Sequence, residues 1–187
     1  MKIGFVGLGN VGSKLAGSLL RNGYEVIVRD LNEEFMADFV GRGAVAANSP
    51  KQLAELSDLI ITCLPSPAAC SAVMEGSENE AGIIAGLSAG KIWLEMSTTD
   101  ESEIRRIGAL VEAAGADPVD CPVSGGCHRA DTGNISIFAG CSRSVFERAL
   151  PVLTTLGRRV LHTGELGTAS KLKVVTNYLA TAHLVAL

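Results

Sequence analysis

Short runs of apolar and β-branched residues alternate with stretches of helical periodicity along the whole chain. The runs predict strands over residues 2–6, 25–29, 58–64, 91–96, 117–122, 135–139 and 158–163. Between them, segments such as 10–22 and 100–115 repeat apolar residues every three to four positions, which predicts helices. Because the strands are apolar at nearly every position, both faces of the sheet must be covered, which is typical of parallel sheets. We expect an α/β protein with a doubly wound, mostly parallel sheet.

The last segment differs from the rest of the chain. Residues 168–187 are helical in pattern and rich in Ala, Leu and Val, and they stop without a C-cap glycine or a proline. The pattern favours one long helix in a chain that is part of a longer protein. We therefore divide the sequence into a domain over 1–165 and the start of a connecting helix over 166–187.

Composition and charge narrow the classes of protein. A chain of 187 residues suffices for one domain, and 47% hydrophobic with 19% charged residues is typical of a soluble globular protein. The net charge of −4 with no basic stripe argues against nucleic acid, and no apolar run approaches the ~20 residues that span a membrane. The N-terminus has the pattern of a strand and turn, not of a signal peptide. The five cysteines lack C-x-x-C spacing, which predicts free thiols in the cytoplasm and no metal site.

A glycine-rich turn follows the first predicted strand. The stretch "VGLGNVG" has G-x-G-x-x-G spacing and leads into a helix. In that context Gly7 permits the tight turn, Gly9 lets a pyrophosphate approach the backbone, and Gly12 allows close helix–strand packing. The helix N-terminus offers free N–H groups and a positive dipole end. We predict a Rossmann-type domain in which the cofactor is bound by Gly7, Leu8, Gly9, Asn10, Val11 and Gly12.

The second predicted strand ends at Asp30. A carboxylate there accepts hydrogen bonds from the adenosine ribose hydroxyls and repels a 2′-phosphate, so NAD is the expected cofactor. NADP stays possible because Arg29, one position earlier, could swing toward a phosphate. The alternative for this region is an ordinary βα turn with a surface aspartate.

A second glycine cluster, "DCPVSGG", follows the fifth predicted strand. Ser124 offers a hydroxyl, and Gly125 and Gly126 offer unobstructed backbone N–H groups, a combination suited to a carboxylate. A tight structural turn explains the segment equally well.

Four stretches together resemble a known family. "GLGNVG", "EMSTTD", "DCPVSGG" and "GTASKLKVVTN" occur in the order and spacing of the β-hydroxyacid dehydrogenases, the relatives of 3-hydroxyisobutyrate dehydrogenase. The resemblance covers the whole chain. It implies that Leu64 and Pro65 line the cofactor, that Thr98 lies on the nicotinamide side near cofactor and substrate, and that residues 124–126 grip the substrate carboxylate. It also implies an all-helical domain after the long helix, absent here, through which homo-oligomers form.

This chain departs from the family in the loop after the second glycine cluster. The family continues S-G-G-x-x-G-A, whereas this chain has "SGGCHRA", with Arg129 in place of the glycine. The bulk and charge of Arg129 could reshape the pocket toward a larger or more acidic substrate. We interpret His128 as a surface residue.

Two lysines near the chain end compete for a catalytic role. Residues i and i+4 share a helix face, so Lys173 and Asn177 can converge on one substrate, while Lys171 is turned by about 200° from Lys173. The family pattern G-x-[GA]-x-x-x-K-x-x-x-N, taken from Gly167, also implies Lys173 and Asn177. Without the other motifs, a solvated charge would be the better interpretation of either lysine. We predict that Lys173 is catalytic and that Lys171 faces solvent.

For these residues, the resemblance implies hydride transfer between a nicotinamide cofactor and a small 3-hydroxy acid or its semialdehyde. Lys173 would accept or donate the hydroxyl proton, and Asn177 would orient the substrate. The 6-phosphogluconate dehydrogenases place a histidine where Thr176 stands, and imine reductases replace the lysine, so both are disfavoured within the enzymes. The alternative from another class is a non-catalytic NAD(P)-binding module that senses redox state or scaffolds a partner.

Overall fold

The structure is a computed structural model that describes residues 1–186. Its strands are β1 (Lys2–Val6), β2 (Glu25–Arg29), β3 (Val45–Ala46), β4 (Leu59–Thr62), β5 (Ile92–Glu95), β6 (Asp117–Asp120), β7 (Val123–Ser124), β8 (Ile135–Gly140) and β9 (Gly157–Gly164). Its helices are α1 (Gly12–Arg21), α2 (Glu33–Gly41), α3 (Pro50–Leu56), α4 (Pro67–Glu75), α5 (Glu101–Ala113), α6 (Gly126–Asp131), α7 (Arg143–Leu156) and α8 (Thr168–Val185), with a 3₁₀ turn, η1, at Ile83–Gly86.

All strands of the described part join one sheet. Their order is β3-β2-β1-β4-β5-β6-β8-β7, and β9 pairs with β8. The strands from β3 to β6 are parallel, while β8 runs antiparallel to β6 and β7. Because the chain order reverses between β1 and β4, a crevice opens there at the carboxyl ends of the strands. The predicted doubly wound, mostly parallel sheet is confirmed.

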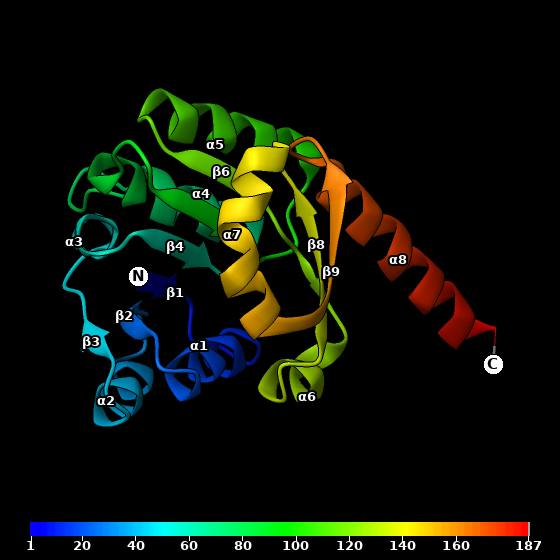
Figure 1. Cartoon of the computed structure of the whole chain (residues 1–187), viewed down its shortest axis with the longest axis horizontal. Helices are drawn as coiled ribbons and strands as arrows, with labels where there is room; N and C mark the ends of the chain where they lie inside the picture. The colour runs from blue at the N-terminus through cyan, green and yellow to red at the C-terminus, as the bar shows by residue number, and fades with distance from the viewer. Residues whose placement is uncertain (187) are drawn as a thin grey trace.

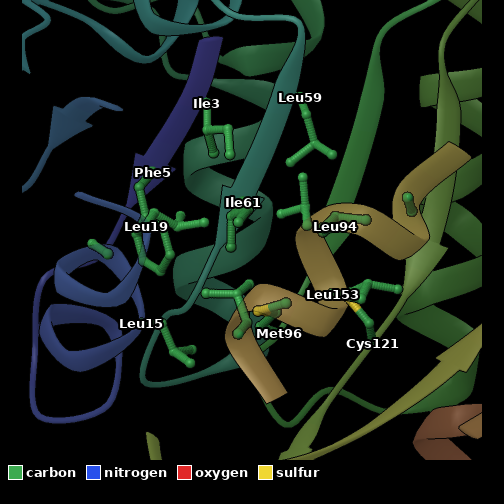
Figure 2. Close-up of a cluster of buried hydrophobic side chains, with 14 of the residues drawn as sticks. Ile3, Phe5, Leu15, Leu19, Leu59, Ile61, Leu94, Met96, Cys121 and Leu153 are labelled. Carbon is green, nitrogen blue, oxygen red and sulfur yellow. The ribbon is translucent and has the colours of Figure 1, made fainter. Parts of the chain in front are cut away.

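Helices cover both faces of this sheet, as the apolar strands require (Figure 1). In β4, Leu59 and Ile61 pack into one core cluster while Ile60 packs into the other. Figure 2 shows the first cluster, where side chains of β1 and β4 meet Leu15 and Leu19 of α1. Such two-sided burial explains why these strands show no polar alternation.

The structure adds elements that the sequence pattern did not indicate. Strands β3 and β7 have two residues each, too few for a periodic signal, and β3 is exposed. The predicted strand 117–122 ends at Asp120, because the chain turns there toward β7. Helix α6 begins inside the second glycine cluster.

Helix α8 leaves the body of the molecule at the edge formed by β8 and β9 (Figure 1). It begins after Gly167, whose φ of 92° lies in the left-handed region that favours glycine. The predicted boundary between 165 and 166 falls in the turn between β9 and α8, and the division into two units stays a prediction. Within residues 1–186, no helix is long and apolar enough to cross a membrane.

Candidate active site

A groove of about 950 Å³ follows the carboxyl ends of the parallel strands. Its walls come from the turn after β1, the end of β2, the loops after β4 and β5, helix α4 and the second glycine cluster, and Lys173 of α8 completes it. A site at the carboxyl edge of an open α/β sheet, at the point where strand order reverses, is where such folds bind ligands.

The three glycines of the first turn have three different environments. Gly7 has a φ of 96°, and a Cβ there would lie 2.3 Å from the Cys63 carbonyl oxygen. A Cβ on Gly12 would lie 1.9 Å from the Gly7 carbonyl oxygen, so helix and strand approach too closely for any side chain. Nothing lies within 4 Å of a Cβ on Gly9, which faces open space in the groove. This geometry agrees with a tight turn, close packing and an open approach to the backbone.

The same turn leaves backbone donors free for an anion. Within residues 1–186, the N–H groups of Gly9, Asn10 and Val11 have no hydrogen-bond acceptor. Asn10 and Val11 line the groove, directly before the N-terminus of α1. Free N–H groups at a helix N-terminus bind phosphate groups, so the residues present fit the pyrophosphate of a dinucleotide.

Asp30 connects the end of β2 to the glycine turn. Its Oδ2 accepts a hydrogen bond of 2.6 Å from the Leu8 N–H, and its Oδ1 accepts one of 2.8 Å from the Asn32 N–H. Each carboxylate oxygen has a second lone pair, and Asp30 lines the groove, so acceptors remain for ribose hydroxyls. Leu8 itself is buried and contributes through this backbone contact.

A fully buried carboxylate joins the loops after β4 and β5. Glu95 accepts hydrogen bonds from the Thr62 hydroxyl (2.6 Å), the Cys70 thiol (2.7 Å) and the Ser97 N–H (2.6 Å). The Ser97 hydroxyl in turn accepts from the Leu64 N–H at 2.8 Å. Burial raises the pKa of Glu95. The network fixes Leu64 and its neighbours at the groove.

The second glycine cluster forms another part of the groove wall. Gly125 and Gly126 line the groove with φ values of 133° and 77°, and nothing lies within 4 Å of a Cβ on Gly126. Ser124 is half-buried in β7, paired with Ser136, and lies outside the groove lining. The aliphatic part of Arg129 packs on Gly125, 2.9 Å from the position of a Cβ there.

Lys173 is the cation on the α8 side of the groove. Its residue is only 9% exposed, and burial lowers the pKa of its ammonium. Within residues 1–186, no carboxylate lies within ion-pair distance of its Nζ. A lysine in this environment holds its proton less tightly than a solvated one and is suited to proton transfer.

Asp120 anchors the helix that carries Lys173. From the end of β6 it accepts hydrogen bonds of 2.8 Å from both the N–H and the hydroxyl of Ser170. Asp120 is fully buried, and burial raises the pKa of its carboxyl. A carboxylate at a helix N-terminus also interacts favourably with the helix dipole. This contact sets the first turn of α8 against the sheet.

Two further polar residues of the terminal motif, Lys171 and Asn177, lie away from the groove. Lys171 is exposed and forms an ion pair of 2.8 Å with Glu101 of α5, so it faces away from Lys173 as predicted. Asn177 is exposed one turn beyond Lys173 and does not line the groove. Its substrate-orienting role stays a prediction.

The structure therefore brings most of the predicted site residues into one groove. The predicted residues that line it are Gly7, Gly9, Asn10, Val11, Gly12, Asp30, Leu64, Pro65, Thr98, Gly125, Gly126 and Lys173. Sequence reasoning missed the wall from α4 and the loop after it, including Val73, Ser77 and Glu80. It also missed the supporting roles of Glu95 and Asp120. The position of Glu95 and Asp120 at the ends of predicted strands was the available signal.

Fold and groove define a dinucleotide-binding domain. A sequence model described as the NAD binding domain of 6-phosphogluconate dehydrogenase matches residues 2–164, and the chain belongs to that family. The matched part of the chain is thus an NAD-binding domain. Lys173 and the rest of α8 lie outside the matched range.

Named relatives are hydroxyacid dehydrogenases. The 2-(hydroxymethyl)glutarate dehydrogenase of Eubacterium barkeri is 35% identical over 187 residues, 100% of this chain and 61% of that protein. The mitochondrial 3-hydroxyisobutyrate dehydrogenase of Mus musculus is 33% identical over 183 residues, 98% of this chain and 54% of that protein. The solved structure of Mycobacterium tuberculosis 3-hydroxyisobutyrate dehydrogenase with L-serine has a TM-score of 0.90 at 26% identity, covering 99% of this chain and 62% of that one. The chain thus spans 54–62% of the length of these proteins.

Proposed function

We propose that the protein is an NAD(P)-dependent 3-hydroxyacid dehydrogenase or semialdehyde reductase that uses Lys173 as its general acid and base. The observation that carries the proposal is the position of Lys173, buried in the same groove as the glycine turn and with a lowered pKa. The names of the relatives support the reaction class.

The roles of the residues follow from their places in the groove. A bound nicotinamide supplies the hydride chemistry, and the chain aligns it and moves the proton. In oxidation, neutral Lys173 accepts the substrate hydroxyl proton. In reduction, its ammonium donates the proton and stabilises the developing negative charge on oxygen. Gly125 and Gly126 offer backbone N–H groups to the substrate carboxylate, and Thr98 lines the same groove.

A substrate panel tests the proposal. The full-length protein is assayed with NAD and with NADP against small 3-hydroxy acids and their semialdehydes, and cofactor binding is titrated in parallel. We expect turnover of at least one member, lowered about 10²–10⁴-fold by Lys173→Ala. Cofactor binding without turnover of any member would instead support a redox-sensing or scaffold module.

We extend the proposal to self-association and location. Beyond Lys173, helix α8 exposes Val174, Val175, Tyr178 and Leu179 by 55%, 52%, 72% and 59%, and exposed apolar patches mark interaction sites. Sedimentation of the chain should show a species larger than a monomer that Leu179→Glu shifts toward monomer; a monomeric parent chain would contradict this.

The five free cysteines support a reducing compartment such as the cytoplasm.

A further inference from the structure

Arg29 and Glu80 form an ion pair across one end of the groove. Arg29 is the last residue of β2, and Glu80 lies in the loop after α4. The Arg29 Nη2 is 3.4 Å from the Glu80 Oε1, and its Nη1 donates a 2.7 Å hydrogen bond to the Asp30 carbonyl. Both side chains line the groove next to Asp30, at the end away from Lys173. Since Asp30 marks the ribose of the adenosine, this end receives the adenine half of the cofactor.

The Arg29 guanidinium has a donor that the protein leaves unused. Its Nε–H is buried and, within residues 1–186, has no hydrogen-bond acceptor. Buried polar groups are nearly always paired, and an unpaired one is costly. The side chain is 24% exposed, so part of the guanidinium faces the groove. A flat cation in this position suits both the face of an aromatic ring and a phosphate.

Glu80 is held by its own turn rather than by Arg29. The Ser77 N–H donates a 2.8 Å hydrogen bond to the Glu80 carbonyl, and Gly76 pairs with Ala81 in an isolated antiparallel bridge. Gly76 has a φ of 86°, and a Cβ there would lie 2.4 Å from the Glu80 carbonyl oxygen, so the turn is tightly closed. Removing the charge of Glu80 therefore leaves the backbone of this loop in place.

We propose that Arg29 is a cofactor-binding residue at the adenosine and that Glu80 sets cofactor choice by neutralising it. With Glu80 in place, a 2′-phosphate would meet the Asp30 carboxylate and a guanidinium whose charge Glu80 already neutralises. Without the Glu80 charge, the same guanidinium is free to pair with the phosphate, which carries nearly two negative charges at neutral pH. Glu80 is thus a specificity-determining residue in addition to Asp30.

The test measures cofactor binding, so it does not depend on the proposed reaction. Dissociation constants for NAD and NADP are determined by calorimetry at fixed salt for the parent chain and for Glu80→Gln. We expect the ratio Kd(NADP)/Kd(NAD) to fall about tenfold in Glu80→Gln, and to fall less at 0.5 M salt because charges are then screened. Glu147→Gln is the matched control, because it removes a carboxylate paired with Arg143 on α7, outside the groove, and should leave the ratio unchanged.

Variants of Arg29 show whether the effect passes through it. In an Arg29→Met background, Glu80→Gln should change the ratio by less than twofold. Arg29→Lys keeps the positive charge. In that background, Glu80→Gln should again lower the ratio Kd(NADP)/Kd(NAD). An unchanged ratio in Glu80→Gln, or an equal fall in the Arg29→Met background, overturns the proposal. If Arg29→Met folds poorly, the Arg29→Lys background alone decides. An unchanged ratio Kd(NADP)/Kd(NAD) on adding Glu80→Gln in that background also overturns the proposal.

Discussion

The two ends of the groove are built in different ways. At the cofactor end, the turn of residues 7–12 is made of backbone and is held by contacts within one βαβ unit, such as the Leu8 N–H to Asp30. At the catalytic end, Lys173 stands on a helix whose start is buried and whose remainder is exposed: Ser170 is 2% exposed and Tyr178 is 72% exposed. The start of that helix is fixed by Asp120, fifty residues earlier in the chain.

Because the two ends are built differently, we expect substitutions to affect cofactor binding and turnover separately. The turn of residues 7–12 and Asp30 lie in or next to β1, α1 and β2, so substitutions there should change cofactor affinity. The catalytic end contributes one buried cation on an extended helix, so substitutions there should change the proton-transfer step and leave affinity for the cofactor in place.

The largest effect should come from Lys173→Ala. Loss of the general acid and base removes about 10²–10⁴-fold in turnover, whereas the cofactor dissociation constant should change less than about threefold, because the glycine turn is untouched. Lys171→Ala is the matched control on the same helix, since it removes only an exposed ion pair with Glu101. Steady-state kinetics and cofactor titration measure both quantities. Equal losses of turnover in the two variants would refute the assignment.

The pH dependence of turnover should follow Lys173. Burial lowers the pKa of its ammonium, so the neutral base becomes available at lower pH than for a solvated lysine. For oxidation, kcat/KM should rise about tenfold per pH unit below that pKa and become constant above it. For reduction, kcat/KM should fall as the pH rises through the same range. Lys173→Arg cannot titrate there and should lose this dependence in any residual activity. A parental profile that stays flat, or that rises with pH for reduction, would contradict the role.

At the cofactor end, Gly9→Ala should weaken binding without unfolding the domain. Because nothing lies within 4 Å of a Cβ at Gly9, an alanine fits the free protein, but its methyl group occupies the approach to the backbone N–H groups. We expect a loss of about 2 kcal/mol, or roughly 30-fold in Kd, for NAD with an unchanged melting temperature. Gly41→Ala, at another position where nothing lies within 4 Å of a Cβ, is the control and should change neither quantity. Unaltered NAD affinity in Gly9→Ala would show that the pyrophosphate lies elsewhere.

The division also explains what the sequence could and could not predict. Glycine spacing acts locally, because the turn, the close approach of Gly12 and the start of α1 are set by neighbouring residues. The two lysines were separable because helical periodicity is local as well, and Lys171 and Lys173 do point apart. The glycine turn and the start of α1 were therefore predictable from one short stretch.

The supports of the site were not predictable in the same way. Asp120 was visible in its motif, but no local pattern pairs it with Ser170. The wall from α4 consists of small apolar residues such as Ala69 and Val73. Their sequence pattern is that of ordinary core residues, and only the tertiary structure places them in the groove wall. Tertiary contacts between distant segments determine both the pairing of Asp120 with Ser170 and the position of the α4 wall.

The smallest predicted effect concerns Asp30. Its Oδ2 and Oδ1 accept hydrogen bonds from the Leu8 and Asn32 N–H groups, and it lines the groove where the ribose hydroxyls of NAD are expected. Asp30→Asn removes the charge that repels a 2′-phosphate but keeps one acceptor oxygen. In a partly solvated site this is worth about 1 kcal/mol, so the preference for NAD over NADP should narrow about fivefold.

The measurement is the ratio of kcat/KM values for the two cofactors, with binding titrations beside it. Asp38→Asn is the control, because Asp38 pairs with Arg42 on the exposed side of α2 and does not line the groove. The side-chain amide that Asp30→Asn introduces would also face one of the two N–H donors, so affinity for NAD itself should fall, and only the ratio isolates the charge. A parental preference for NADP would show that Arg29, rather than Asp30, decides which cofactor is preferred. The change of the NADP-to-NAD ratio in Glu80→Gln would then measure how strongly Arg29 does so.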